Sequence, residues 1–144
     1  MMPTTTMERP KVGVGGILAR PDGRVLLAQR GREPNLGRWA FPGGSVKFQE
    51  SLADALVREF WEETHLNISS PILAWVAEIK DNHRIHFVVL DYVVESTDYD
   101  IRAGSDVDDL AWVGPEEWFN LNLADGMAAC LNDVGVRHLI GWEA

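Results

Sequence analysis

The stretch PGGSVKFQESLADALVREFWEETHL, residues 42–66, joins a pair of glycines to the clearest helix pattern in the chain. Ser51, followed three residues later by Asp54, is typical of a helix N-terminus, and apolar side chains then recur at helical spacing. The pattern predicts a helix over residues 51–64. Its apolar face is expected to contain Leu52, Ala53, Leu56, Val57, Phe60 and Trp61.

Three carboxylates crowd the second half of this helix. Glu59, Glu62 and Glu63 are spaced so that they become neighbours in one arc beside the apolar face. Like charges repel at this spacing, and the helix dipole disfavours anions near the carboxyl end. A hard divalent cation such as Mg²⁺ or Mn²⁺ would remove both penalties, because these ions prefer oxygen ligands. The alternative is a solvated acidic face, partly neutralised by Arg58.

The segment before the helix, Pro42-Gly43-Gly44, predicts a loop that ends a short strand at residues 39–41. Glycine lets the backbone approach a ligand closely, and such a loop can offer carbonyl oxygens to a metal or amide groups to phosphate oxygens. A glycine pair alone most often marks an ordinary turn. A glycine pair that leads into a helix with three clustered acids favours a site for metal and phosphate.

The segment from Gly44 to Leu66 resembles the Nudix box, a signature of spaced glycine, glutamate, arginine and apolar positions. The matching positions are Gly44, Glu50, Arg58, Glu59, Phe60, Glu62, Glu63 and Leu66. One position departs, because His65 stands where the signature has its final glycine. We expect His65 to end the helix in the left-handed conformation, which histidine tolerates better than most residues. A second hypothesis makes His65 a metal ligand or proton shuttle.

The resemblance implies a Nudix-type α/β/α sandwich around a mixed β-sheet. It also implies a pyrophosphatase-type hydrolase that uses Mg²⁺, with Mn²⁺ as the alternative ion. The implied metal ligands are Glu59, Glu62, Glu63 and the backbone carbonyl of Gly44 or Gly43. The implied catalytic residues are Glu59, which would accept a proton from the attacking water, Glu62, and Arg58, which would orient the carboxylates with support from Glu50.

Substrate-binding positions are expected on both sides of the box. The candidates are Arg30, Arg38, Gly43 and Gly44, and the alternative for each arginine is a solvated strand end. Some family members take their base from a later loop, so Asp106, Asp108 and Asp109, before a predicted strand, are alternative bases or extra ligands. Glu78 and Asp91 are further candidates on strands. For each of these acids the alternative is solubility or loop capping.

The remaining elements follow from periodicity and turn residues. Strands are expected at 12–19, 24–29, 72–80, 84–94 and 110–113. The first two should form a hairpin across the turn at residues 21–23. Apolar continuity in residues 72–80 and 84–94 predicts burial on both faces. A helix should begin at Gly114, and a last helix over residues 125–134 should be stopped by Gly135.

Length and charge bound the class of protein. The 144 residues carry 22 acidic and 13 basic side chains, for a formal charge of −9. We expect a flexible start at residues 1–10 and a single Nudix hydrolase domain at 11–144. The acidic balance argues against nucleic-acid binding, and no apolar run is long enough to span a membrane. One cysteine, Cys130, excludes an internal disulfide and predicts a cytoplasmic protein. The apolar residues 136–142 could serve a homodimer.

The signature does not name the substrate. We expect hydrolysis of a nucleoside diphosphate linked to another moiety, with ADP-ribose or another nucleotide sugar as the first candidate. The alternative is a MutT-type nucleoside triphosphate pyrophosphohydrolase. A more distant alternative is a non-catalytic nucleotide-binding regulator, which should have lost box carboxylates. Specificity is expected to come from residues 31–38, 81–84 and 95–108. Among the tryptophans, Trp39, Trp75 and Trp112 could stack on a base, but core positions are favoured.

Overall fold

The computed structural model describes residues 8–81, 84–104 and 106–142. Most of the predicted flexible start and part of the segment 81–84 therefore lie outside the described residues. The strands are β1 (Lys11–Leu18), β2 (Val25–Arg30), β3 (Trp39–Ala40), β4 (Gly43–Ser45), β5 (Ser69–Lys80), β6 (His86–Glu95) and β7 (Val107–Val113). The helices are α1 (Leu52–Thr64), α2 (Met127–Asn132), α3 (Val134–Ile140) and a short 3₁₀ helix, η1 (Trp118–Asn120).

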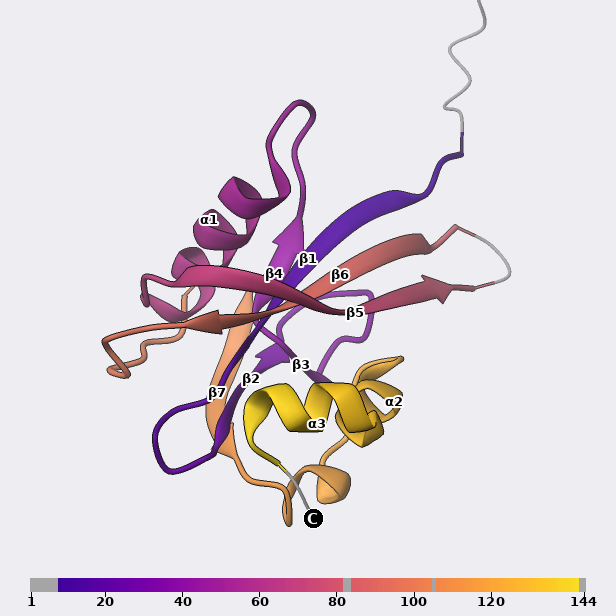
Figure 1. Ribbon diagram of the computed structural model, residues 1–144. Coiled ribbons are helices and arrows are strands. Elements are labelled where there is room, and N and C mark those ends of the chain that lie inside the picture. The colour runs from indigo at the N-terminus through magenta and orange to yellow at the C-terminus, as the bar shows by residue number, and fades with distance from the viewer. Residues whose placement is uncertain (1–7, 82–83, 105, 143–144) are drawn as a thin grey trace, which may run out of the picture.

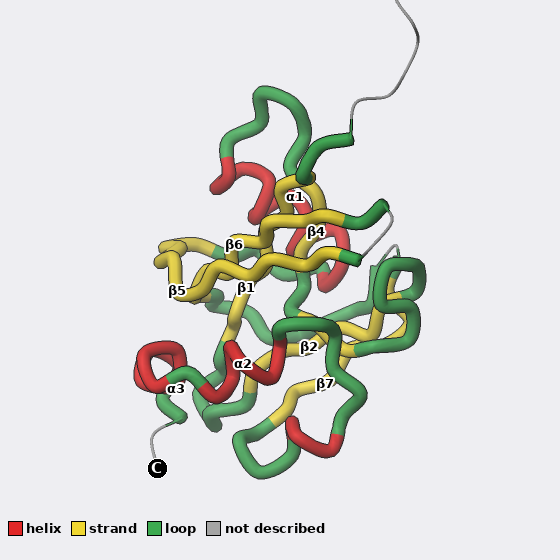
Figure 2. Tube along the Cα trace, turned by 90° about the vertical axis from the view of Figure 1, so that its right-hand side faces the viewer, coloured by secondary structure: helices red, strands yellow, loops and turns green. Residues whose placement is uncertain are grey.

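The strands form two sheets. One has the order β4-β1-β6-β5, with β1 and β6 parallel and the other pairs antiparallel. The other is antiparallel, with the order β3-β2-β7. Helix α1 lies on one side of the strands, and α2 and α3 lie on the opposite side (Figures 1 and 2). The predicted α/β layering is confirmed, but its strands are divided between two sheets.

The predicted hairpin between the first two strands is wrong. The turn forms, since Gly23 donates to the carbonyl of Arg20 at 2.8 Å, but only one bridge, Ala19 to Val25, joins the strands beyond it. β1 pairs along its whole length with β6, whereas β2 pairs with β7. The two strands diverge because each finds a longer partner elsewhere, and the space between the sheets holds part of the core.

Two hydrophobic clusters result from this division. One contains Phe60 and Leu56 of α1 with Leu18 and Leu26. The other lies on the side of α2 and α3 and contains Ile17, Val25, Phe41, Met127, Cys130, Leu131, Val136, Ile140 and Trp142, with Trp39 and Trp75 packed against it. Trp112 packs against the first cluster. These three tryptophans are therefore partly buried at the edge of the core, close to the core positions that were favoured.

Strand β5 is far more exposed than its apolar sequence predicts. Ile72, Leu73 and Val76 each keep about half of their surface accessible. β5 is the edge strand of its sheet, and its first five residues are exposed. The expectation of burial on both faces is wrong here because the covering helices do not extend over this strand as far as the sheet does.

Helix α1 begins and ends as predicted. The Ser51 hydroxyl accepts from the Asp54 amide at 3.1 Å, and His65 closes the helix in the left-handed conformation with φ of 62°. The His65 ring bonds the Arg102 carbonyl at 2.9 Å, which supports a structural role. The buried face is narrower than predicted. It contains Ala55, Leu56, Phe60 and Thr64, while Leu52, Val57 and Trp61 remain more than a third exposed.

Contact between α1 and β1 gives a first test of this packing. A methyl group on Gly16 would stand 2.7 Å from the Phe60 ring, which is fully buried. We expect Gly16→Ala to lower the free energy of unfolding by about 1–3 kcal/mol, because overpacking strains a close-packed core. Gly13→Ala is the matched control, since its methyl would meet neighbours at 3.4 and 3.5 Å. Urea unfolding measures both, and equal losses would contradict this account.

The end of the chain differs from its prediction. The helix expected from Gly114 is only the short η1, and the helix expected over 125–134 is two helices, α2 and α3. They separate at Asp133, whose carboxylate accepts from the Val136 amide at 3.0 Å and begins α3. Gly135 lies inside α3, and Gly141, with φ of 79°, ends it.

Three apolar residues of the terminal segment are part of the core. Val136, Ile140 and Trp142 are all at most 5% exposed, and the Trp142 indole donates to the Gly23 carbonyl at 2.6 Å. Leu139 of the same segment stays 43% exposed, so the expected interface role of residues 136–142 stays a prediction. In the described part of the chain, none of the helices has the length and apolar character that crossing a membrane requires.

Candidate active site

The glycine pair before α1 is a strand and not the predicted loop. β4 pairs with β1 so that Gly43 faces Gly15 and Gly44 faces Val14. The strands approach so closely that a side chain on Gly43 would collide with the backbone of Val14 and stand 2.8 Å from the Gly15 Cα. The glycines are needed because only a bare backbone fits there.

Arg58 ties α1 to the segment before it. Its guanidinium donates to both carboxylate oxygens of Glu50 at 2.8 Å and to the Ser45 carbonyl at 3.1 Å. It also donates to Glu59 at 2.7 Å and to Glu62 at 3.4 Å. The hydrogen bond from Arg58 holds the pKa of Glu50 at about 2, so this pair stays charged at neutral pH.

Two of the three predicted carboxylates, Glu59 and Glu63, meet the glycine strand. The Glu59 carboxylate lies against Gly44, where it fills the place of a Cβ. Glu63 accepts from the Gly43 amide at 3.0 Å. Burial raises the pKa of Glu63 to about 7, with a smaller contribution from the Glu59 charge and against the effect of the Gly43 hydrogen bond. The repulsion expected from the sequence is thus present between these groups.

The carboxylates are suited to a divalent cation by chemistry, although they are not pre-assembled around one. Within residues 8–81, 84–104 and 106–142, no three carboxylate, imidazole or thiol side chains are gathered closely enough to hold an ion. Instead, Glu59 and Glu62 accept hydrogen bonds from Arg58, and Glu63 accepts one from the Gly43 amide. Hard oxygen donors with surplus negative charge are nevertheless what Mg²⁺ and Mn²⁺ prefer.

The carboxylates line an open cavity of about 680 Å³. Its wall also includes Gly13, Gly15, Val89 and Asp91 from the four-stranded sheet and Phe41 from the segment after β3. Cationic side chains reach it although the whole chain is acidic. Among the described residues they are Arg9, Lys11, Arg30, Arg32 and Arg84. The cavity thus combines a carboxylate end, fit for a cation, with cationic groups fit for phosphate.

Residues 9–134 match the NUDIX domain family. The chain belongs to the Nudix family. The match confirms the family that residues 44–66 resembled. The two-sheet architecture is that of the family's solved structures.

Named Nudix proteins align over most of the chain. An ADP-ribose pyrophosphatase of Methanocaldococcus jannaschii is 32% identical over 114 residues, which are 78% of this chain and 63% of that protein. The uncharacterized Nudix hydrolase YvcI of Bacillus subtilis is 32% identical over 78% of this chain and 72% of its own length. A crystal structure of a MutT Nudix hydrolase from Burkholderia pseudomallei superposes with a TM-score of 0.80 at 29% identity, covering 88% of this chain and 99% of the other. The chain thus spans less than two thirds of the archaeal relative.

The two predicted substrate arginines have different positions in this Nudix fold. Arg30 lines the cavity, and its charge lowers the pKa of Glu63 against the effect of burial. Its Nε donates to the Pro34 carbonyl at 2.6 Å. Arg38 does not line this cavity. It pairs with Asp125 at 3.2 Å beside a neighbouring hollow, so its expected contact with substrate is not supported.

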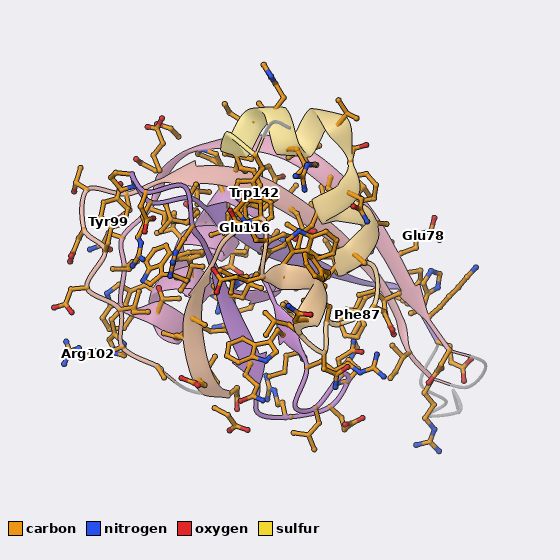
Figure 3. The ribbon with its side chains drawn as sticks, turned by 90° about the horizontal axis from the view of Figure 1, so that it is seen from below. Glu78, Phe87, Tyr99, Arg102, Glu116 and Trp142 are labelled. Atoms are coloured by element: carbon orange, nitrogen blue, oxygen red, sulfur yellow. The ribbon has the colours of Figure 1, made fainter. Side chains whose placement is uncertain are left out.

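The fold places some of the alternative catalytic bases at the cavity and others away from it. Asp106 lines the cavity and pairs with Arg32 at 3.2 Å. Asp108 and Asp109 belong to β7 rather than to a loop, and neither lines the cavity. Glu78 is exposed on the outer side of the β5–β6 hairpin (Figure 3). Only Asp106 therefore keeps the position that a base from a later loop would need.

The segments predicted to determine specificity contribute unequally to the cavity wall. Residues 31–38 supply Arg32, Glu33, Pro34 and Asn35 to the cavity, whereas the described part of residues 95–108 supplies Asp106 alone. Tyr99 packs against Trp112 with ring centres 6.0 Å apart. Tyr99 and Arg102 lie on the opposite side of the molecule from Phe87, which lines the cavity (Figure 3). Arg102 and Gly104 of this loop donate backbone hydrogen bonds to the carbonyls of Thr64 and Glu63 at the end of α1, at 3.0 and 2.9 Å.

Sequence reasoning missed several cavity residues. The missed residues include Lys11, Phe41, Phe87, Val89 and Met127. The alternation of side chains along a strand carried a signal for these residues. Lys11, Gly13 and Gly15 lie on one face of β1, and their partners Phe87, Val89 and Asp91 lie on the same face of β6. That face could not be assigned to a cavity without knowing what covers it.

Asp91 gives a test of how burial affects stability. It is 7% exposed, and burial raises its pKa from 3.8 to about 7. The folded state then binds the proton more tightly than the unfolded state, so stability falls as pH rises from about 4 through 7. The shift corresponds to roughly 4 kcal/mol as an upper bound.

We expect Asp91→Asn to be more stable than wild type at pH 8 and to lose that advantage near pH 4. The asparagine keeps the shape of the side chain but does not titrate. Urea unfolding of both proteins at the two pH values, with metal removed, measures the difference. Glu63 titrates in the same direction in both proteins, so the comparison isolates Asp91. An advantage that is independent of pH would contradict this account.

Proposed function

We propose that this Nudix chain hydrolyses the pyrophosphate linkage of a nucleoside diphosphate joined to another moiety, with Mg²⁺ or Mn²⁺ bound. The observation that carries the proposal is that Glu59 and Glu63 meet the Gly43–Gly44 strand, and that Glu62 lines the same nucleotide-sized cavity. We further propose a nucleotide sugar such as ADP-ribose as substrate, supported by the aligned archaeal protein of that name.

Each box residue has a role in this proposal. The bound ion would neutralise developing charge on the diphosphate and lower the pKa of a water molecule. Glu59, Glu62 and Glu63, with the Gly44 carbonyl, would hold it. Glu59 would also accept the proton of the attacking water, with Asp106 as the alternative base on the cavity wall.

The cations of the site serve the proposal in two ways. Arg58 would keep Glu59 and Glu62 oriented, because Glu50 and the Ser45 carbonyl hold its guanidinium in place. Arg30 would pair with a phosphate oxygen from the cavity wall. Neutral amides of β4 would complete the phosphate contacts.

A MutT-type nucleoside triphosphate pyrophosphohydrolase is the second candidate. Lys11, Arg32 and Arg84 line the cavity in addition to Arg30, and this number of cations also suits a substrate with a third phosphate. A non-catalytic regulator is disfavoured because all the box carboxylates are present. A cytoplasmic location, inferred from Cys130 alone, and a homodimer stay predictions.

A substrate panel tests the function. ADP-ribose, other sugar nucleotides, dinucleoside polyphosphates and the nucleoside triphosphates are incubated with Mg²⁺ or Mn²⁺, and the products are separated. We expect metal-dependent cleavage of at least one member that stops when a chelator is added. Release of a nucleoside monophosphate with a sugar phosphate supports the nucleotide-sugar candidate, and release of pyrophosphate supports the MutT-type candidate. Absence of turnover with either ion would overturn both in favour of a binding module.

A further inference from the structure

One wall of the cavity is a flat patch of sheet built from alternate residues. Gly13 of β1 is in register with Val89 of β6, and Gly15 is in register with Asp91. Val89 is in turn in register with Ala77 of β5. Residues directly opposite in a sheet present their side chains on the same face. These five residues all line the cavity, so they form one continuous surface.

The small residues of this surface suit contact with a planar ring. Its two glycines and one alanine leave the middle of the wall without bulky side chains, and Phe41 and Met127 line the same cavity from other elements. A nucleobase is flat, apolar on its faces and polar only along its edge. Burial of such faces against small apolar groups is favourable, provided that a polar group meets the edge.

Asp91 is the polar group on this surface. A Cβ on Gly15 would collide with the Asp91 Oδ1, so the carboxyl group leans across β1 in the space that the glycine leaves. Gly15 is also in register with Gly43 of β4. The Asp91 carboxyl therefore lies over β1, the strand next to the one that carries the proposed diphosphate site.

The carboxyl group of Asp91 lacks a protein partner. It is 7% exposed, and none of the described residues donates a hydrogen bond to it or forms an ion pair with it. Among the described residues, every side-chain nitrogen or oxygen that is fully shielded from solvent has a hydrogen-bond partner. The Asp91 oxygens have none, so they are not fully shielded and open into the cavity that Asp91 lines. Burying a polar group without a partner is unfavourable. A ligand that supplies the missing hydrogen bonds would remove that penalty.

The protonation of Asp91 fits a base edge. Burial raises its pKa to about 7, so a neutral carboxyl group is substantially populated at neutral pH. A neutral carboxyl offers one donor and one acceptor side by side. The common nucleobases present an adjacent donor and acceptor on the edge used for base pairing.

We propose that Asp91 is a specificity-determining residue that binds the edge of the nucleobase, with the ring lying on the patch formed by Gly13, Gly15, Val89 and Ala77. This inference rests on the proposed function for the identity of the ligand as a nucleotide. It adds a base-binding residue outside the box, on β6.

Binding of nucleoside monophosphates tests this inference. These molecules are the nucleotide product of both candidate reactions, and ribose 5-phosphate is the same molecule without the base. Titration calorimetry with Mg²⁺ present compares the four monophosphates with ribose 5-phosphate in wild type, Asp91→Asn and Asp91→Leu. We expect at least one monophosphate to bind wild type ~10-fold or more tightly than ribose 5-phosphate.

The two variants separate recognition from structure. Asparagine also offers a donor and an acceptor, so Asp91→Asn should keep the preference for the base within about threefold. Leucine offers neither. In Asp91→Leu the preference for the monophosphate over ribose 5-phosphate should therefore fall about 10-fold, while the affinity for ribose 5-phosphate stays unchanged. A full preference in the leucine variant, or no preference in wild type, would overturn the inference. Failure of the proposed function would appear separately, as absence of hydrolysis in the substrate panel.

Discussion

Glu62→Gln is expected to lower metal-dependent hydrolysis by about three orders of magnitude or more. The substitution keeps the size of the side chain but removes one of the three charges that would hold the ion, and a loss of ~4 kcal/mol of transition-state stabilisation corresponds to about 10³ in rate. Steady-state kinetics over a range of Mg²⁺ concentrations measures the change. Most of the loss should persist at saturating metal if Glu62 orients the ion as well as binding it.

The stability of the same variant distinguishes a site from a structural acidic face. The Glu62 side chain is 41% exposed, and its ion pair with Arg58 is long, at 3.4 Å. Removing its charge therefore costs little folding stability. Relief of repulsion from Glu59 and Glu63 offsets that loss by a few tenths of a kcal/mol. With metal removed, the melting temperature should stay unchanged or rise.

Asp54→Asn is the matched control for Glu62→Gln. It removes an exposed carboxylate from the first turn of the same helix, away from the cavity, and should leave the rate unchanged. A large drop in the melting temperature of metal-free Glu62→Gln, or an equal loss of rate in Asp54→Asn, would contradict the assignment of the carboxylates to a metal site.

Gly44→Ala is expected to lower the rate by about 100-fold without unfolding the protein. Its methyl group would stand 2.8 Å from Glu59 Oε1 and closer still to the rest of that carboxylate. The backbone of Gly44 does not have a positive φ, so alanine fits the strand and the carboxylate has to move. A displacement of about 1 Å in a reacting group costs on the order of 10² in rate.

A double-mutant cycle tests whether Gly44→Ala acts through Glu59. The effects of two independent substitutions add, whereas those of coupled residues do not. If the methyl group acts by displacing Glu59, Gly44→Ala should cost little further rate in the background of Glu59→Gln. Full additivity would show that Gly44 matters for another reason. Circular dichroism and thermal melting of each variant check that the fold is retained.

The helical half of the site could be predicted because its information is local. The N-cap at Ser51, the left-handed exit at His65 and the adjacency of Arg58 to Glu62 all follow from spacing within one helix. Contacts between residues three or four positions apart require no knowledge of the rest of the chain. The Nudix box is contained in this segment, so family membership was also accessible from residues 44–66.

The glycine strand could not be predicted in the same way. Gly43 and Gly44 carry no side chains that would indicate a strand, and glycine in a strand is uncommon. Their pairing depends on a partner, β1, that lies almost thirty residues earlier in the chain and is itself glycine-rich. The same limit applies to Arg38, whose partner Asp125 is 87 residues away, and to the division of β1 and β2 between two sheets.

By itself, the sequence determined the helix, its three carboxylates and its arginine, since helical periodicity places these side chains together whatever surrounds them. Only the tertiary structure decided that Gly43 supports Glu63, that Asp108 belongs to a strand outside the cavity, and that Asp91 opens into it. These outcomes depend on strand register and on the face of each strand that is covered. A register shift of a single residue would reverse every one of these faces.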